Sequence, residues 1–436
     1  MRQIFQNLKT GEISQPELPV PAVKDGHLLI QSHKSLISLG TEKMLLNFGK
    51  ANWINKARQQ PDKVQQVIQK IRTDGLQPTV KAVFNKLDQP LPLGYSSVGT
   101  VIAVGTGVQD YHIGDRVISN GSHAEIVCVA ENLCAKVPDN VDDSTAAFTV
   151  VSAIGLQGIR LLQPTLGETF VVTGLGLIGL LCCQLLQANG CRVIGFDYDV
   201  KKIELAREFG VEAWDLNSGV DSVAVVLAAT DGNGADGILI TAATTSNEPI
   251  EQAPKMCRKR GRVVLVGVVG LQLNRTEFFQ KEVSFHVSCS YGPGRYDENY
   301  EQKGMNYPIG FVRWTEQRNF QAVLQLMAEE KISVKKLITQ EISFAQAIQV
   351  YQQDHNQSLG ILFDYPKKVN HQKNTIFLQS NPKNWSLSSK VRIGAIGAGS
   401  FAGSTLFPAL KKTQAQLVVI SSTSGSSGNH LGKKFQ

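Results

Sequence analysis

The chain has 436 residues, of which 42% are hydrophobic and 19% are charged. This length is enough for two or three domains with a sizeable core, and the composition is that of an ordinary globular protein. No apolar run reaches the roughly 20 residues that a membrane helix needs, and the N-terminus lacks an apolar signal core, so we expect a cytoplasmic protein without a membrane span. The net charge of +7 suits anionic substrates and gives no reason to expect nucleic-acid binding.

Residues 1 to about 145 are rich in β-branched residues and glycine turns, which predicts a β-rich domain. Residues 50–88 interrupt it with a polar, basic stretch of helical period, in which Pro61 and Gly75 are the expected breaks. We therefore predict a β domain with an inserted helical cap. The histidines are scattered, and a packing or surface role is expected for His112 and His123, near glycine turns. The seven cysteines show no C-x-x-C spacing, which favours reduced thiols over disulfides or metal ligands.

From residue 146 the pattern changes to helices that alternate with strands. A helix is expected through Leu162, and apolar runs mark strands at 169–172, 193–196, 237–241 and 262–267. This alternation predicts an α/β domain over residues 146–284, with a doubly wound parallel sheet and right-handed crossovers.

A glycine fingerprint follows the first of these strands directly. In such a turn the first glycine permits tight chain reversal, the second lets the backbone approach a pyrophosphate, and the third lets helix and strand pack closely. The phosphates then lie on the helix N-terminus, where free N–H groups favour negative charge. We predict a dinucleotide site at this turn, formed by Gly174, Leu175, Gly176, Leu177, Ile178 and Gly179.

Asp197 ends the next apolar run. A carboxylate there can accept hydrogen bonds from both hydroxyls of an adenosine ribose and repel a 2′-phosphate, which favours NAD over NADP as the cofactor. The alternative is that Asp197 caps the helix that begins near Lys201. Lys202, about one turn into that helix, is either a contact to the adenine-side ribose or a solvated lysine.

Residues 285–365 contain a tyrosine- and glycine-rich stretch at 291–296, a helix near 318–330 and a final strand at 359–363. Arg295 and Arg313 could clamp a sugar phosphate or the cofactor pyrophosphate through paired N–H donors; the alternative is solvated arginines or ion pairs. Residues 366–390 are polar and weakly patterned, which suits a linker.

A second fingerprint, with Gly397, Gly399 and Ala402, follows another apolar run and precedes a further strand at 417–420. No carboxylate follows that strand, and residues 391–436 contain roughly a third of the strands that such a sheet requires. We expect this segment neither to bind a cofactor well nor to fold stably alone.

Residues 1 to about 365 resemble the medium-chain dehydrogenase/reductase superfamily, through Gly40-Thr41-Glu42, residues 94–105, 114–117 and 124–125, and the first fingerprint with Asp197. The resemblance implies a GroES-like barrel over 1–145, a Rossmann domain over 146–284 and a return to the catalytic domain over 285–365. Residues 391–436 are similar to the start of a Gfo/Idh/MocA-type oxidoreductase, as a truncated second Rossmann segment. The fused order resembles bi-domain oxidoreductases found among polysaccharide biosynthesis genes.

The chain departs from the zinc-dependent members of that family. They place a cysteine where Leu39 stands, and a histidine and a glutamate where Tyr95 and Ser96 stand. Residues 146–155 offer no alternative ligand, and the four-cysteine structural lobe is missing around residues 118–125. Leucine and tyrosine at these places cannot complete a zinc site, so we predict no zinc.

Without a Lewis acid, hydride transfer needs a positioned acid or base at the substrate oxygen. The resemblance puts Thr41 at the place of a proton-relaying hydroxyl and Tyr95 at the place of a lost ligand, so the two could donate to a substrate carbonyl. Tyr95 could instead fill space, and Thr41 could bond the backbone of a turn. Glu42 is expected to be a surface or inter-loop partner.

These observations predict a zinc-independent, NAD(P)-dependent oxidoreductase that acts on a hydroxyl or carbonyl of a sugar-like substrate, including a nucleotide-linked one. Two alternatives stay open: a cofactor-binding but chemically silent scaffold or redox sensor, and a zinc-dependent alcohol dehydrogenase. By analogy with relatives, a homodimer through the edge of the Rossmann sheet is expected, with residues 263–269 as the edge strand.

Overall fold

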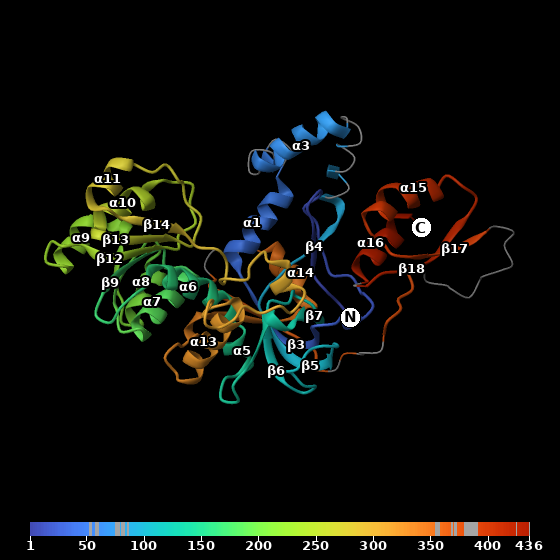
Figure 1. The fold of residues 1–436 in the computed structure, drawn as a ribbon, viewed down its shortest axis with the longest axis horizontal. Helices are drawn as coiled ribbons and strands as arrows, with labels where there is room; N and C mark the ends of the chain where they lie inside the picture. The colour runs from blue at the N-terminus through green and yellow to red at the C-terminus, as the bar shows by residue number, and fades with distance from the viewer. Residues whose placement is uncertain are drawn as a thin grey trace.

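The computed structural model describes residues 1–51, 55–56, 61–74, 79, 83–84, 87–353, 358–367, 369, 373–378, 391–423 and 425–435. Figure 1 shows a β barrel at the base, a nucleotide-binding domain on the left, a helical arm that projects upward, and a separate C-terminal unit on the right. Among the described helices, none has the length and apolar character needed to cross a membrane. None of the seven cysteines is paired with another in the structure, and their reduced state stays a prediction.

The barrel domain is built on a seven-stranded sheet whose order is β15-β16-β3-β5-β6-β8, with β7 also paired to β3. A smaller antiparallel sheet of order β2-β1-β4 lies beside it. Both confirm the β-rich prediction for the first part of the chain. The strands are β1 (Phe5–Asn7), β2 (Ile13–Ser14), β3 (His27–Ile37), β4 (Pro90–Pro92), β5 (Ser97–Val104), β6 (Arg116–Ser119), β7 (Ile126–Ala130), β8 (Cys134–Lys136), β15 (Ile338–Ser343) and β16 (Gly360–Asp364).

The helical arm contains α1 (Leu39–Lys50) and α3 (Pro61–Asp74). The described helix α3 runs from Pro61 to Asp74. The residues next to both of its ends lie outside the described ones, so the breaks expected at Pro61 and Gly75 stay predictions. Figure 1 shows α3 at the far end of this arm, away from the barrel strands.

The nucleotide-binding domain has six parallel strands in the order β11-β10-β9-β12-β13-β14. Numbered from β9, this is the doubly wound order 3-2-1-4-5-6, which confirms the predicted parallel sheet and puts the reversal of strand order at β9. The strands are β9 (Thr169–Thr173), β10 (Arg192–Asp197), β11 (Glu212–Asp215), β12 (Ala235–Ile240), β13 (Cys257–Leu265) and β14 (Ser284–Val287). The helices are α6 (Thr149–Leu162), α7 (Leu177–Ala188), α8 (Val200–Glu208), α9 (Ser222–Ala229), α10 (Glu248–Met256) and α11 (Arg275–Lys281).

Two sequence predictions about this sheet need correction. β14 pairs with β13 as far as Val287, so the predicted domain boundary between residues 284 and 285 falls inside a strand. β13 is paired on one side with β12 and on the other with β14. Residues 263–265 of the predicted dimer edge therefore have no free backbone groups to offer a second subunit, and among the described strands the free edges are β11 and β14.

One hydrophobic cluster joins the barrel to the nucleotide-binding domain. It includes Val98 and Val117 of the barrel strands, Phe148 and Val151 around the start of α6, and Leu181 of α7, each at most 1% exposed. Because the two domains share this buried core, α6 and α7 are held in fixed register with the barrel.

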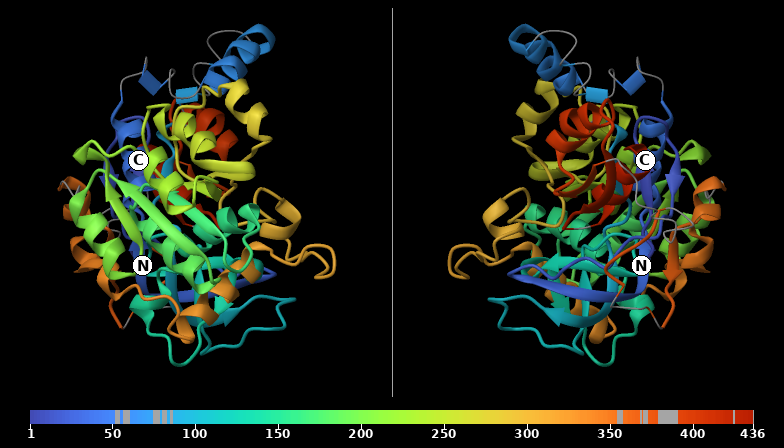
Figure 2. Two further views of the ribbon diagram at one scale, coloured as in Figure 1. Left: turned by 90° about the vertical axis from the view of Figure 1, so that its left-hand side faces the viewer. Right: turned by 90° about the vertical axis from the view of Figure 1, so that its right-hand side faces the viewer.

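The chain returns to the barrel through α12 (Glu298–Glu301), α13 (Glu316–Ala328), β15, α14 (Ala347–Gln352) and β16. α13 packs against α6. Figure 2 shows that the segment before α13 projects from the side of the molecule. The predicted helix at 318–330 and strand at 359–363 thus exist with slightly shifted bounds.

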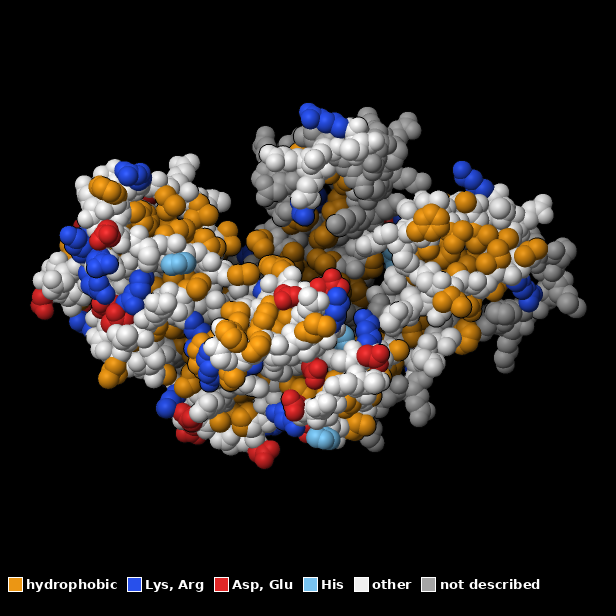
Figure 3. Space-filling model, in the orientation of Figure 1, with side chains coloured by type: hydrophobic (Ala, Val, Ile, Leu, Met, Phe, Trp, Pro, Cys, Tyr) orange, Lys and Arg blue, Asp and Glu red, His pale blue; other side chains and the backbone are white. Residues whose placement is uncertain are grey.

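The C-terminal unit (residues 391–435) has a two-stranded parallel sheet of β17 (Arg392–Ile396) and β18 (Gln416–Ser421), with α15 (Phe407–Leu410) and α16 (Ser426–Phe435). Its small core contains Ala398, Ala402, Phe407 and Leu431. Parallel sheets are normally buried on both faces. Figure 3 shows hydrophobic side chains gathered on this unit, and its exposed apolar residues are Val391, Ile396, Phe401, Leu406 and Val419.

Candidate functional site

The first glycine turn (Gly174–Gly179) connects β9 to α7 at the point where the strand order reverses. Gly174 has φ of +96°, and a Cβ there would lie 2.6 Å from the backbone nitrogen of Ala242. A Cβ on Gly179 would lie 1.9 Å from the carbonyl oxygen of Gly174. The first and third glycines are therefore required by backbone conformation and by helix–strand packing.

Gly176 has a different reason to be glycine. Its φ of −66° suits any residue, and apart from its neighbours in the chain no atom lies within 4 Å of where its Cβ would be. It is the N-cap residue of α7, and no side chain bonds the helix amides there. The open space above Gly176 and the uncapped N–H groups of α7 fit a pyrophosphate, since phosphates bind at such helix N-termini.

Asp197, the last residue of β10, lies against this turn. Its Oδ2 accepts a hydrogen bond from the backbone N–H of Leu175 at 2.6 Å, and its Oδ1 accepts from the N–H groups of Tyr198 and Asp199. The cap of α8 is Asp199, whose carboxylate accepts from the Lys201 N–H at 3.0 Å. The capping alternative for Asp197 is therefore wrong.

Lys202 lies on the first turn of α8, and its Nζ is 3.4 Å from Asp199 Oδ2. This ion pair places the ammonium group beside the cap of α8. The pair is partly exposed, so it leaves Lys202 free to exchange partners at little energetic cost.

Thr241, just after β12, is a part of the turn that sequence reasoning missed. Its Oγ1 donates to the carbonyl oxygen of Gly174 at 2.5 Å, and its backbone N–H donates to the Thr173 carbonyl at 2.9 Å. These bonds fix the carbonyl that Gly179 approaches most closely. The sequence did contain a signal for this contact: Thr241 is a hydroxyl residue at the carboxyl end of β12, the strand that pairs with β9.

The proposed hydroxyl pair lies at the start of the helical arm. Thr41 belongs to the first turn of α1, and its side chain lies outside the described residues. Tyr95 is half-buried just before β5 and packs against the shared core. The Leu36 N–H donates to the Ser96 carbonyl at 3.0 Å, so the backbone that enters α1 lies beside the segment that carries Tyr95.

The residues that the structure describes do not fit a zinc site. They contain no group of three or more His, Cys, Asp or Glu side chains that could hold a metal ion. Ser96 is buried, and its hydroxyl donates to the Ala147 carbonyl at 2.6 Å. Neutral hydroxyls of this kind are not zinc ligands. The absence of zinc stays a prediction, to be tested by metal analysis.

A buried polar cluster beneath α1 was not anticipated. His123 is fully buried, with Nδ1 2.7 Å from Ser35 Oγ and Nε2 3.2 Å from Glu42 Oε1. Glu42, 2% exposed, also accepts from the Ser38 N–H and the Tyr351 hydroxyl. Burial next to this carboxylate raises the pKa of Tyr351, which keeps its hydroxyl a donor. Glu42 is thus an internal partner and not a surface residue, and His123 has the predicted packing role.

The two arginines proposed for phosphate binding do not contact the first glycine turn. Arg295 forms an ion pair with Glu301 and lies 4.4 Å from the ring centroid of Tyr296. Arg313 lies 3.8 Å from the ring centroid of Trp314. Arg295 is thus an ion-paired arginine, whereas Arg313 is stacked on an aromatic ring.

The second glycine turn (Gly397–Ala402) has the same local shape with less around it. Gly397 has φ of +95°, and its N–H donates to the Ser421 carbonyl at 2.9 Å. A Cβ on Gly397 or Gly399 would meet no atom within 4 Å. The N–H of Gly174 bonds the Phe196 carbonyl in the same way, so Ser421 corresponds to Phe196, and Ser422 stands where the first site has Asp197. This turn therefore lacks a carboxylate for a ribose.

Two stretches of the chain match protein-family models. Residues 64–139 match the alcohol dehydrogenase GroES-like domain, and residues 178–303 match the zinc-binding dehydrogenase family. The first stretch covers barrel strands β4 to β8, and the second begins in the first glycine turn and covers the rest of the parallel sheet.

Individual relatives agree with these matches. Over 298 residues the chain is 26% identical to a sorbitol dehydrogenase of Halalkalibacterium halodurans, which covers 60% of this chain and 79% of that protein. Galactitol-1-phosphate dehydrogenase from Escherichia coli superposes with a TM-score of 0.63 at 18% identity, over 84% of this chain and 100% of the other. 2R,3R-butanediol dehydrogenase from Bacillus subtilis gives 0.62 at 20% identity, over 83% and 99%. The two structures support the fold.

Proposed function

We propose that this chain, an oxidoreductase similar to the zinc-type alcohol dehydrogenases that acts on an alcohol or carbonyl group, transfers hydride between NAD and a sugar-like substrate without a zinc ion. The observation that carries the proposal is the position of the Asp197 carboxylate against the backbone of Leu175, beside the open space over Gly176. A phosphate-binding turn and a ribose-binding carboxylate are thereby adjacent, as a dinucleotide requires.

The bound nicotinamide supplies the hydride donor or acceptor. The chain's own part is to hold the cofactor: Gly176, Leu177 and Ile178 present the uncapped amides of α7 to the pyrophosphate, and Gly174 and Gly179 give the turn its shape. Asp197 accepts hydrogen bonds from the ribose hydroxyls and repels a 2′-phosphate, which favours NAD over NADP. Lys202 can turn from Asp199 toward the ribose, since an exposed ion pair is weak.

The acid–base work is assigned to Tyr95 and Thr41. A hydroxyl that donates to the substrate oxygen stabilises the negative charge that develops there during hydride transfer, and it can exchange a proton with that oxygen. The half-buried position of Tyr95 beside the entry to α1 supports this role. The substrate class is argued from the relatives, whose names include sorbitol and galactitol-1-phosphate dehydrogenase, and a nucleotide-linked sugar belongs to the same proposal.

Two further assignments belong to this proposal. Residues 391–435 act as the start of a second, Gfo/Idh/MocA-like nucleotide-binding segment that has no ribose carboxylate and does not hold a cofactor, in keeping with a role in polysaccharide biosynthesis. The chain forms a homodimer through the free sheet edge at β14, where Val287 of the strand itself is 59% exposed. Size measurement in solution tests the dimer.

The test uses the purified full chain with NAD or NADH and a panel of polyols, their phosphates and nucleotide sugars, followed at the nicotinamide absorption band. Turnover is expected without stoichiometric zinc, and Tyr95→Phe should lower kcat by about 100-fold, the typical contribution of one positioned acid. Tyr296→Phe is the matched control, because its ring is 77% exposed, and should leave kcat unchanged. Tight NADH binding with no turnover would favour a silent cofactor-binding protein, and one bound zinc per chain would contradict the proposal.

A further inference from the structure

Two loops border the part of the crevice that Asp197 marks. One follows β10 and begins with Tyr198, and the other follows β12 and runs to Glu248, the first residue of α10. The second loop touches the first glycine turn, because a Cβ on Gly174 would lie 2.6 Å from the nitrogen of Ala242. In a doubly wound sheet the ligand lies in the crevice outside the carboxyl ends of the strands. A dinucleotide whose ribose contacts Asp197 therefore places its base between these two loops.

A hydrogen bond joins the two loops. The Tyr198 hydroxyl donates to Glu248 Oε2 at 3.2 Å, although the two residues are 50 positions apart in the chain. Partial burial, together with the neighbouring Glu248 carboxylate, raises the pKa of Tyr198, so its hydroxyl stays protonated and can donate. The Tyr198 side chain belongs to a residue that is 52% exposed, so a ligand can reach this bond from solvent.

Further hydrogen bonds hold both loops in place. Asn217 Nδ2 donates to the carbonyl oxygen of Tyr198 at 2.6 Å. The Glu248 N–H donates to Ser246 Oγ at 3.1 Å, and Gln252 Nε2 donates to Glu248 Oε1 at 3.0 Å. The Glu248 carboxylate is thus fixed by its own helix and by the loop opposite. Groups that are held in this way lose less conformational entropy when a ligand binds.

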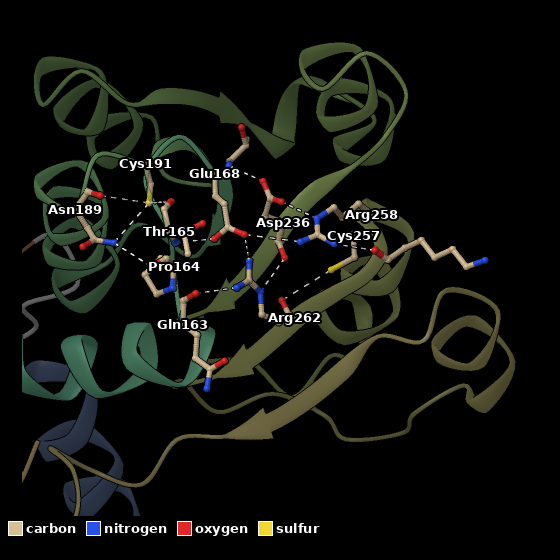
Figure 4. A network of polar contacts seen from close by, with 12 residues as sticks. Gln163, Pro164, Thr165, Glu168, Asn189, Cys191, Asp236, Cys257, Arg258 and Arg262 are labelled. Atoms are coloured by element: carbon tan, nitrogen blue, oxygen red, sulfur yellow. Dashed lines mark hydrogen bonds and ion pairs between the residues drawn. The ribbon is translucent and has the colours of Figure 1, made fainter. Parts of the chain in front are cut away.

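The Glu248 carboxylate has no cationic partner among the residues that the structure describes. It accepts hydrogen bonds there from the neutral side chains of Tyr198 and Gln252. The opposite situation, shown in Figure 4, exists near the amino ends of β9 and β12, where two carboxylates bind two arginines: Glu168, Asp236, Arg258 and Arg262. A carboxylate offers about four lone-pair sites, so Glu248 can still accept from a further donor.

Adenine carries a donor that suits this carboxylate. Its exocyclic amino group is an N–H donor, and an N–H that donates to a charged oxygen forms a stronger hydrogen bond than one that donates to a neutral oxygen. In hypoxanthine a carbonyl oxygen replaces the amino group, and it would face the carboxylate as a second acceptor. The Tyr198 ring can stack on either base, because stacking depends little on which base is present.

We propose that Glu248 selects the base of the cofactor by accepting a hydrogen bond from the adenine amino group, and that Tyr198 positions the Glu248 carboxylate for this contact. The inference rests on the NAD site of the proposed function. It adds a contact that reads the base to the contact of Asp197 with the ribose. Glu248 is thereby a specificity-determining residue, whereas Tyr198 acts through its hydrogen bond to Glu248.

Isothermal titration of the full chain with NADH, and with the reduced dinucleotide that carries hypoxanthine in place of adenine, tests this contact without turnover. The wild type should bind NADH about tenfold more tightly, the usual effect of one charge-assisted hydrogen bond. Glu248→Gln should bring the ratio of the two affinities close to one, because an amide can accept from an amino group or donate to a carbonyl. Glu251→Gln makes the same change in net charge at an exposed residue of the same helix, and should leave the ratio unchanged.

Tyr198→Phe separates the positioning role from the contact itself. It keeps the ring and loses the hydroxyl, so the ratio should fall by less than in Glu248→Gln, about threefold, the effect of one neutral hydrogen bond. Equal affinity of the wild type for the two dinucleotides, an unchanged ratio in Glu248→Gln, or an equal fall in Glu251→Gln would overturn this inference and leave the NAD site in place. Failure of the wild type to bind NADH would contradict the proposed function, and this inference with it.

Discussion

The two glycine turns of this chain share a local shape and differ in their surroundings. Gly174 and Gly397 have φ values of +96° and +95°, and each follows a parallel strand. A Cβ on Gly174 would collide with the strand neighbour at Ala242, whereas one on Gly397 would meet nothing. The first turn is embedded in a six-stranded sheet and the second sits on two strands. The glycine motif therefore specifies the shape of the turn. Whether the turn can bind a cofactor depends on the strands next to it.

Those neighbouring strands supply the groups that the fingerprint lacks. β10 brings Asp197 to the first turn, and the residue after β12 brings the Thr241 hydroxyl. At the second turn Ser421 gives only the backbone carbonyl contact that Phe196 gives at the first, and Ser422, the counterpart of Asp197, has no carboxylate. Substitutions at matched positions of the two turns test whether only the first one binds a cofactor.

The largest effect is expected from Gly179→Ala. Its Cβ would lie 1.9 Å from the Gly174 carbonyl oxygen, which is itself held by Thr241, so the backbone must move. We expect a loss of roughly 3 kcal/mol in the free energy of unfolding and at least a 100-fold loss in NADH affinity. Urea unfolding and fluorescence titration measure the two. Wild-type affinity in this variant would show that the turn tolerates the change and that the packing argument is wrong.

Gly176→Val separates ligand approach from protein packing. The position has an ordinary φ and open space, so the free energy of unfolding should stay within about 0.5 kcal/mol of the wild type. NADH affinity should fall about tenfold or more, because the side chain would occupy the space assigned to the pyrophosphate. Gly399→Val is the matched change at the second turn and should alter neither quantity. A fall in NADH affinity with Gly399→Val would mean that the second turn holds a cofactor.

Asp197→Asn tests the ribose carboxylate. Asparagine can still accept from the Leu175 N–H, but it no longer repels a 2′-phosphate, so the preference for NADH over NADPH should fall about tenfold. The complementary change, Ser422→Asp, adds a carboxylate just after β18, at the position that matches Asp197, and should create no second binding site. An unchanged preference in Asp197→Asn would remove the basis for assigning NAD.

Glu316, the first residue of α13, is expected to affect the pH dependence of stability and not cofactor binding. It is fully buried, neither carboxylate oxygen has a hydrogen-bond partner among the described residues, and burial, with help from Glu301, raises the pKa of its carboxyl to about 8. The folded protein then holds a proton that the unfolded chain releases above its ordinary pKa of 4.5. Stability should therefore fall as the pH rises from about 4.5 to 8 and then level off.

The slope is at most about 1.4 kcal/mol per pH unit. Glu316→Gln should reduce this dependence in urea unfolding followed by tryptophan fluorescence, with Glu298→Gln as a control at an exposed carboxylate on the same returning segment. Stability that rises with pH over this range in the wild type, and not in Glu316→Gln, would contradict the protonated, buried state.

The sequence predicted the elements whose causes are local. The helix through Leu162 ends where expected, because breaks and apolar periodicity act within a few residues. The doubly wound sheet also followed from the alternation of strands and helices.

What the sequence could not predict depends on contacts between distant residues. Glu42 accepts from Tyr351, which is 309 positions away, and Arg160 meets Asn319 across 159. Neither pairing leaves a periodic or spacing signal in either segment. The prediction that residues 263–269 form an edge strand was wrong for the same reason: an apolar run does not reveal whether one or both edges of a strand are paired.

The number of NADH molecules bound per full-length chain tests the central comparison most directly. Isothermal titration should give one site per chain, whose affinity is lowered by Gly176→Val and unchanged by Gly399→Val. Two sites per chain, or one site that responds only to Gly399→Val, would contradict the account in which the first glycine turn alone is completed by its neighbouring strands.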